Sequence, residues 1–310
     1  MEASQEKVSV ARLSVYSNSS LVILKVVVGI LTGSVAIMSE AIHSGIDLLA
    51  ALIARYSVKK SAEPADNEHR YGHGKYENLS GMIEGSLIFV AAVWIIYESV
   101  KRFFEEFELM ALGAGMAVMA LSAILNFFIA RRIMKVAKKT ESLALEADAY
   151  HLMTDVWTSA GVFAGLVIIQ VTGFVKIDPA IALVVAAFIT HAAYDITRRA
   201  SEGLLDTSLP EEELKVIEGI LKDHDSQFLN FHRLRTRKVG PERHVDLHLT
   251  VPRDMSVKEG HDFVDHLEQS IRKALPNTVI VVHIEPCNAK CEECKMAPNN
   301  NVFAGSGKTP

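Results

Sequence analysis

The run Leu87-Ile-Phe-Val-Ala-Ala-Val-Trp-Ile-Ile96 contains no charged side chain, and it lies in a mostly apolar segment over about residues 79–100. A helix needs about 20 mostly apolar residues to cross the hydrocarbon core of a bilayer. Five further segments of similar length occur at residues 13–37, 38–58, 110–132, 146–172 and 177–197. The sequence therefore predicts an α-helical membrane protein with six transmembrane helices.

The composition supports this interpretation. Apolar residue types make up 49% of the 310 residues and charged types 22%. The alternative is that some apolar runs are buried core helices of a soluble protein, but their number favours a membrane domain. The first run is too long for a signal peptide and lacks a small-residue cleavage site, so no cleaved signal is expected. A formal net charge of -5 argues against a protein that coats nucleic acid.

Lysine and arginine residues predict the orientation of the helices. With the N-terminus inside, the inner segments carry fourteen of them: Lys7, Arg12, Arg55, Lys59, Lys60, Arg70, Lys75, Arg131, Arg132, Lys135, Lys138, Lys139, Arg198 and Arg199. The outer segments carry only Lys101, Arg102 and Lys176. Because basic residues are enriched in cytoplasmic loops, we expect a multi-pass protein of the cell membrane with both termini in the cytoplasm.

Beyond Asp206 the pattern changes to that of a soluble domain. An amphipathic helix begins at Pro210, with acidic residues in its first turn where the helix dipole favours them. The periodicities that follow predict two strands, a helix and a third strand, at residues 230–238, 243–251, 256–274 and 278–285. This α-β-β-α-β order predicts a small α+β domain with its helices on one face of the sheet.

Two His-x-x-x-Asp motifs lie inside predicted spans: His43-Ser-Gly-Ile-Asp47 in the second and His151-Leu-Met-Thr-Asp155 in the fifth. Residues i and i+4 share one face of a helix, so each helix presents an imidazole and a carboxylate in the same direction. Polar groups at membrane depth are costly and should face the bundle interior. Two such helices could supply two nitrogen and two oxygen ligands, which suits a tetrahedral ion such as Zn²⁺. Two unrelated polar contacts are the alternative, but the repeated spacing favours a metal site.

The segment between the second and third predicted spans carries a second candidate site. Asp66, His69 and His73 are spaced so that they could converge on one ion. A solvated loop without a ligand is the alternative interpretation.

The C-terminal domain carries a third group of candidate ligands. His232, His248 and His283 lie on predicted strands and His261 lies on a predicted helix. His283 and Glu285 point to the same face of the last strand. Such a group suits a metal sensor, whereas ordinary surface histidines are the alternative.

The last residues contain two further patterns. Cys287, Cys291 and Cys294 are closely spaced thiols, which in a reducing compartment act as metal ligands or redox groups rather than as disulfides. Three thiolates leave a zinc site one ligand short, so their purpose stays open. The segment Gly305-Ser-Gly-Lys-Thr309 is not a phosphate-binding loop, because Val302 stands where glycine is required and no helix follows.

The paired membrane motifs, together with the loop Pro64-Ala-Asp-Asn-Glu-His-Arg-Tyr-Gly-His-Gly-Lys75, resemble those of the cation diffusion facilitators. The resemblance extends over about residues 10–286. It implies a six-span, homodimeric exporter of divalent transition metals with a ferredoxin-like cytoplasmic domain. It also implies a membrane transport site at His43, Asp47, His151 and Asp155, and a loop site at Asp66, His69 and His73.

The resemblance further implies a binuclear site at the cytoplasmic dimer interface, formed by His232, His248, His261 and His283. Lys75 and Asp206 match a charge interlock that orients the two halves of family members. Two positions depart from the usual pattern. His43 stands where bacterial members often have aspartate, which is similar to the more zinc-selective members. Glu285 stands where the last ligand of the tail site is commonly aspartate, and its longer side chain changes the geometry of the second ion.

We therefore expect export of a divalent metal, zinc first, by metal/proton antiport, with metal sensing by the C-terminal domain. The expected domains are a transport domain at 10–206, a metal-binding dimerisation domain at 208–290 and a disordered tail at 291–310. The expected partners are divalent metal ions, protons, membrane lipid and a second copy of the chain, without nucleic acid. The alternatives are a transporter mainly for iron, manganese or cadmium, and a non-transporting metal sensor or scaffold. A metallohydrolase is disfavoured, because no His-Glu-x-x-His motif occurs and four protein ligands leave no open position.

Overall fold

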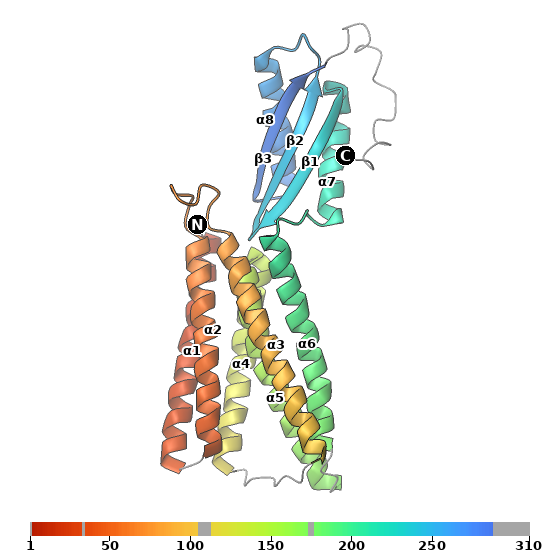
Figure 1. The fold of residues 1–310 in the computed structure, drawn as a ribbon. Coiled ribbons are helices and arrows are strands. Elements are labelled where there is room, and N and C mark those ends of the chain that lie inside the picture. Colours follow the sequence, from red (N-terminus) through yellow and green to blue (C-terminus); the bar gives the residue numbers. More distant parts are fainter. Residues whose placement is uncertain (1, 33–34, 105–112, 173–176, 288–310) are drawn as a thin grey trace. The chain divides into compact units, whose positions relative to one another are not determined.

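The computed structural model of the protein describes residues 2–32, 35–104, 113–172 and 177–287. The chain divides between Leu204 and Leu205 into two compact units, a helical unit and a tail domain (Figure 1). Cys291, Cys294, the glycine-rich segment near the C-terminus and the predicted disordered tail lie outside the described residues.

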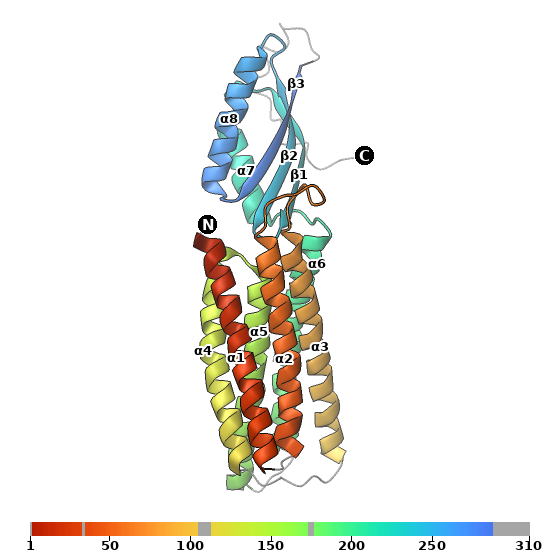
Figure 2. The same ribbon diagram turned by 90° about the vertical axis from the view of Figure 1, so that its left-hand side faces the viewer.

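The first unit consists of six long helices that run alongside one another (Figures 1 and 2). They are α1 (Glu2–Thr32), α2 (Val35–Ser61), α3 (Lys75–Phe104), α4 (Gly113–Thr140), α5 (Leu143–Thr172) and α6 (Ile177–Leu204). Among the described residues, α1, α2, α3 and α6 contain segments long and apolar enough to cross a membrane. The predicted α-helical membrane fold is confirmed.

Several of these helices extend past the apolar runs that predicted them. The first apolar run predicts a span at residues 13–37, but α1 begins at Glu2. The fourth run predicts a span that ends near residue 132, but α4 continues to Thr140. The added turns are still packed, since Val10 and Ala11 of α1 and Ala137 of α4 are buried in one apolar cluster. Hydropathy alone ends a span at its first charged residues, whereas a helix continues for as long as its inner face is covered.

Small residues bring the helices close together. An added Cβ atom at Gly85 of α3 would collide with Thr197 Oγ1 of α6, and one at Gly203 of α6 would collide with Asn78 of α3. Close backbone approach at small residues is typical of helix packing in membranes. The fifth helix lies at the centre of the unit, because α5 packs against α2, α3, α4 and α6.

A buried ion pair joins the helix ends on one side of the unit. Lys7 Nζ of α1 lies 2.6 Å from Glu77 Oε1 of α3, and the Glu77 side chain is fully buried. Ser61 Oγ donates to Glu77 Oε1 at 2.9 Å, and Ser142 Oγ donates to Glu77 Oε2. One carboxylate therefore connects α1, the end of α2, α3 and the segment before α5.

The tail domain has the predicted α-β-β-α-β order. Its elements are α7 (Glu211–Asp223), β1 (Asn230–Val239), β2 (Glu242–Val251), α8 (Val257–Ala274) and β3 (Thr278–Pro286), with a short 3-10 helix, η1 (Asp225–Gln227), that was not predicted. The sheet order is β1-β2-β3, with β1 antiparallel and β3 parallel to β2. Both helices cover one face of the sheet, as predicted (Figure 2).

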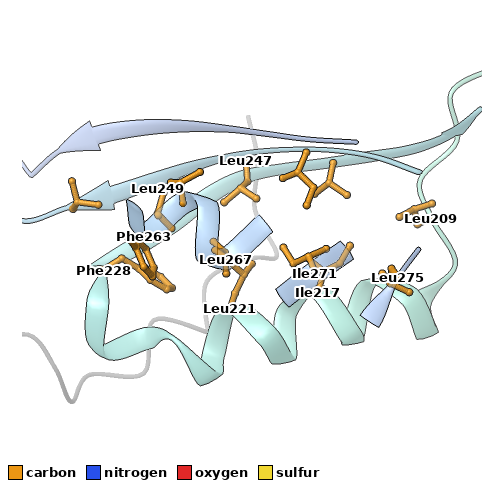
Figure 3. Packing of buried hydrophobic residues seen from close by; sticks show 14 residues of the cluster. Leu209, Ile217, Leu221, Phe228, Leu247, Leu249, Phe263, Leu267, Ile271 and Leu275 are labelled. Carbon is orange, nitrogen blue, oxygen red and sulfur yellow. The ribbon is translucent and has the colours of Figure 1, made fainter. Parts of the chain in front are cut away.

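The covered face of the sheet holds an apolar core that draws only on the tail domain (Figure 3). Leu247 and Leu249 of β2 alternate with polar residues that face the other side. They pack against Leu221 of α7 and against Leu267 and Ile271 of α8, all of which are fully buried. Because the core is self-contained, the tail domain can fold on its own.

The buried ion pair at Glu77 makes a direct prediction about stability. Replacing Glu77 with alanine leaves the Lys7 ammonium buried without its counter-charge, so we expect a loss of about 3 kcal/mol or more in the free energy of unfolding. The measurement is the thermal unfolding midpoint of the purified protein in detergent. Glu63→Ala is the control, because the Lys60–Glu63 pair is exposed and its loss should change the midpoint little. Equal midpoints for both variants would contradict this account.

Candidate metal sites

The two membrane motifs meet through one carboxylate. His151 Nε2 of α5 lies 3.0 Å from Asp47 Oδ1 of α2, and both side chains are buried. His43 Nε2, one turn before Asp47, lies 4.0 Å from the same oxygen, and its side chain is about half exposed. The i, i+4 spacing puts each motif on one face of its helix, and the Asp47–His151 contact shows that these faces of α2 and α5 meet.

Asp155 completes this group. One ligand atom each from His43, Asp47 and Asp155 lie within 4.8 Å of one another. Ligands of one tetrahedral zinc ion, bound at about 2.0–2.2 Å, lie roughly 3.3 Å apart, so small side-chain rotations would close the group around an ion. His151 contacts Asp47 but does not belong to this group of three ligand atoms. Two nitrogen and two oxygen donors with the charge of two carboxylates are suited to a divalent cation.

Polar side chains from two other helices line this site, and sequence analysis did not assign them a role. Asn126 Nδ2 of α4 lies 3.4 Å from Asp155 Oδ2. Lys25 Nζ of α1 donates to Ser44 Oγ at 2.7 Å, next to His43. Both Asn126 and Lys25 are buried. The sequence could have identified both residues, because each is a polar residue within an otherwise apolar span.

The loop after α2 brings its three candidate ligands together. Asp66 Oδ1 accepts hydrogen bonds from the backbone N–H groups of Glu68 and His69, at 2.9 and 2.6 Å. His69 Nδ1 lies 3.4 Å from Asp66 Oδ1, and His73 Nε2 lies 3.3 Å from Asp66 Oδ2. Gly72 permits this arrangement, because its φ of 80° is one that other residues rarely adopt.

The chemistry of the loop fits a metal ion. The backbone hydrogen bonds, that from His69 above all, lower the pKa of Asp66, so the carboxylate is ionised and ready to bind. His73 is buried, and neither of its ring nitrogens makes a hydrogen bond, although Nε2 lies 3.3 Å from Asp66 Oδ2. A buried polar group without a partner is costly, and a metal ion would satisfy it.

In the tail domain the strand register brings three candidate ligands together on the face opposite the core. His248 of β2 lies opposite His232 of β1 and His283 of β3. His248 Nδ1 lies 2.7 Å from Glu285 Oε1, and His232 Nε2 lies 3.6 Å from Glu285 Oε2. Ligand atoms of His232, His248 and Glu285 lie within 4.8 Å of one another.

The two remaining tail candidates are placed differently. His283 is 64% exposed beside this group, with Nε2 3.7 Å from Glu285 Oε1. His261 is not brought to the group within one protomer, because it lies on α8, is 70% exposed and has Asp265 Oδ2 at 3.6 Å. Helix α8 covers the core face of the sheet, so the α-β-β-α-β order that predicted the fold also separates His261 from the strand histidines.

Three other predicted residues have local contacts of their own. Lys75 Nζ lies 3.4 Å from the carbonyl oxygen of Leu204, and Asp206 Oδ2 lies 3.4 Å from Arg237 Nη1. The interlock between Lys75 and Asp206 stays a prediction. Cys287 is buried, and its backbone N–H donates to the Val251 carbonyl.

Both units match known protein domains. Residues 11–205 match the cation efflux transmembrane domain, and residues 209–287 match the cytoplasmic domain of cation efflux proteins. The uncharacterized transporter sll1263 of Synechocystis sp. is 36% identical to this chain, over 83% of each protein. The cation-efflux pump FieF of Pectobacterium atrosepticum is 30% identical, over 87% of this chain and 89% of the pump. A solved chain of CzrB is 34% identical over 26% of this chain and its own full length, with a TM-score of only 0.25.

Long apolar helices are joined to a small α+β domain, and histidine and carboxylate groups gather in both. Together with the domain matches, these features identify a membrane transporter of divalent metal cations. The chain belongs to the cation efflux family, the cation diffusion facilitators. The family resemblance of the sequence is thereby confirmed, and the protein is a multi-pass membrane protein.

The hydrogen bond between His248 and Glu285 makes a prediction about pH. This bond, with help from His232 and His283, lowers the pKa of Glu285. Because the folded pKa is below the unfolded value of about 4.3, Glu285 stabilises the fold above that pH and stops doing so as the pH falls through the folded pKa. In a metal-free tail domain, the difference in melting temperature between wild type and Glu285→Gln should therefore shrink below about pH 4.

The matched control is Glu218→Gln, at an exposed position on α7, which should leave the melting profile unchanged at every pH. A constant difference between wild type and Glu285→Gln from pH 3 to pH 7 would show that the hydrogen bond does not stabilise the ionised carboxylate.

Proposed function

We propose that this protein exports divalent metal ions, zinc foremost, from the cytoplasm in exchange for protons. The observation that carries the proposal is the contact between the two motifs, in which Asp47 Oδ1 lies 3.0 Å from His151 Nε2 at membrane depth. Asp47 is also grouped with His43 and Asp155, so α2 and α5 both contribute to one cluster. A dication crossing a bilayer needs such a cluster, because it loses its water shell on the way.

Proton coupling follows from the chemistry of the ligands. A histidine binds a metal only when its imidazole is neutral, and an aspartate only when it is ionised, so metal binding displaces protons. Histidine has an unperturbed pKa of about 6.5 and changes charge within the ordinary pH range. A site that opens alternately to the two sides of the membrane would exchange metal for protons.

The donor set favours zinc. Two imidazole nitrogens and two carboxylate oxygens suit Zn²⁺ in tetrahedral geometry, whereas Mn²⁺ and other harder ions prefer more oxygen donors. A transporter mainly for iron, manganese or cadmium is the second candidate, because affinity for divalent metals overlaps between such sites. Similarity to a cation-efflux pump supports the export of cations, and the identity of the transported metal is a matter for measurement.

The tail domain supports a homodimer that senses metal. The sheet face opposite the core carries His232, His248 and Glu285, and beside them Val279 and Val281 are 44% and 59% exposed. Burial of these valines against a second copy would stabilise a dimer. His261 would then be supplied to the strand histidines by the partner subunit. With both termini cytoplasmic, metal bound there would report the cytoplasmic metal level to the transport site.

Transport should depend on both membrane carboxylates. Asp47→Asn and Asp155→Asn keep the size of the side chain but remove a negative charge from the site, so we expect zinc flux in proteoliposomes to fall by about 100-fold or more. Asp195→Asn is the matched control, because this aspartate of α6 is 54% exposed and pairs with Arg199 outside the site. Flux above a tenth of wild type in both site variants would rule out this transport site.

Zinc should also stabilise the tail domain. In a fragment of residues 208–286, a hundredfold excess over the dissociation constant should contribute about 2.7 kcal/mol to the free energy of unfolding. The stabilisation should fade below about pH 6, where imidazoles take up protons and lose the lone pair that binds metal. His248→Gln should remove it, whereas His224→Gln, at the end of α7 and outside the group, should retain it. A melting temperature that zinc leaves unchanged at neutral pH would refute metal sensing by this face.

A further inference from the structure

Besides Glu77, two carboxylates that do not belong to any of the candidate metal sites are buried inside the helical unit. Glu84 of α3 has no exposed surface, and Asp148 of α5 is 1% exposed. Glu84 lies just before the most apolar run of the chain, and Asp148 lies one turn before His151. Asp148 acts electrostatically on Glu84, and His151 acts electrostatically on both carboxyl groups.

The hydrogen-bond partners of these two side chains are hydroxyl groups. Ser80 Oγ donates to Glu84 Oε1 at 2.9 Å, and Ser14 Oγ donates to Asp148 Oδ1 at 3.0 Å. The second oxygens, Glu84 Oε2 and Asp148 Oδ2, are buried without a hydrogen-bond partner. Within the described residues, no lysine or arginine forms an ion pair with either carboxylate.

Glu77 provides an internal comparison. It is equally buried on α3, but Lys7 neutralises its charge at 2.6 Å and two serine hydroxyls complete its hydrogen bonds. A buried carboxylate with such a partner stays ionised at an acceptable cost. A carboxylate without one removes the cost of its charge by binding a proton. A lysine therefore balances the charge of Glu77, whereas a bound proton would neutralise Glu84 and Asp148.

We propose that Glu84 and Asp148 form a proton-holding pair that carries part of the protons exchanged for metal, although neither residue touches the metal. This inference rests on the proposed metal/proton antiport and identifies a proton site outside the metal ligands. When a dication occupies the membrane site, its positive charge favours the ionised form of both nearby carboxylates. Each carboxylic acid then loses one proton to water and becomes a carboxylate, and it regains that proton when the metal leaves.

The position of the pair suits this role. Asp148 precedes His151 on α5, and Ser14, Ser80 and Glu84 come from α1 and α3, so the pair lies on the side of the transport site where α1, α3 and α5 begin. That side is the one predicted to face the cytoplasm. Protons carried by the pair add to those displaced from the metal ligands, so the number of protons per metal exceeds what the ligands alone supply.

The test is the ratio of proton flux to zinc flux in proteoliposomes, recorded together with a pH-sensitive and a zinc-sensitive dye. Glu84→Gln and Asp148→Asn keep the shape of the protonated side chain but cannot release a proton. We expect each to reduce the ratio by at least about 0.5 proton per zinc while zinc transport persists. The ratio is counted per turnover, so a smaller folded fraction does not change it.

Two controls separate a proton-holding role from a structural one. Glu84→Asp retains a carboxyl group and should restore the wild-type ratio. Ser14→Ala removes the hydroxyl that donates to Asp148 without removing a titratable group, and it should also keep the ratio. Unchanged ratios in Glu84→Gln and Asp148→Asn, with coupled transport in wild type, would overturn the proton-holding pair alone. Zinc transport without proton flux in wild type would overturn the antiport proposal, and the pair with it.

Discussion

The packing of the helical unit is constrained by the free-energy cost of burying a carboxylate and an imidazole inside an apolar bundle. Asp47 and His151 meet this constraint by contacting each other at 3.0 Å, which ties α2 to α5 at one depth. Helix α5 also packs against α3, α4 and α6, so it occupies the centre of the unit. Asn126 of α4 and Lys25 of α1 add polar contacts around the same place. The helices are thus arranged around a polar centre that an ion could occupy.

The two faces of the tail-domain sheet differ in character, because one is covered by the apolar core and the other carries candidate metal ligands. Leu247 and Leu249 of β2 enter the core, and the alternate residue His248 points to the open face. Because the strand period is two, the pattern that builds the core also aligns His232, His248 and Glu285 on the other side. Stability and the proposed metal binding would therefore use different residues of the same strands. In the proposed sensor, a metal ion would bind at the open face and leave the core unchanged.

Sequence analysis predicted the elements well, because long apolar runs and strict alternation are local signals. The strand predicted at 278–285 and the helix predicted at 256–274 each differ from the observed element by one residue at one end. Local signals could not reveal contacts between residues distant in sequence, because such contacts depend on which helices pack together. The Lys7–Glu77 ion pair and the burial of Glu84 near Asp148 are two examples. Motif spacing placed His43 and Asp47 on one face of α2, since they are one helix turn apart. Bringing Asp155 to them required the packing of α5 against α2. The separation of His261 from the strand histidines could be seen only in the tertiary fold. Its proposed role as a ligand requires a second subunit.

The central claim is that one zinc ion is held within the membrane by two imidazoles and two carboxylates from α2 and α5. X-ray absorption at the zinc K-edge tests it most directly, using the full-length protein. The substitutions His73→Ala, His232→Ala and His248→Ala remove the loop and tail sites, and serine in place of cysteine at positions 287, 291 and 294 removes the thiols. The account predicts one bound zinc with four nitrogen and oxygen ligands at about 2.0 Å and the outer-shell scattering of two imidazole rings. A six-coordinate shell of oxygen atoms without imidazole scattering would contradict it.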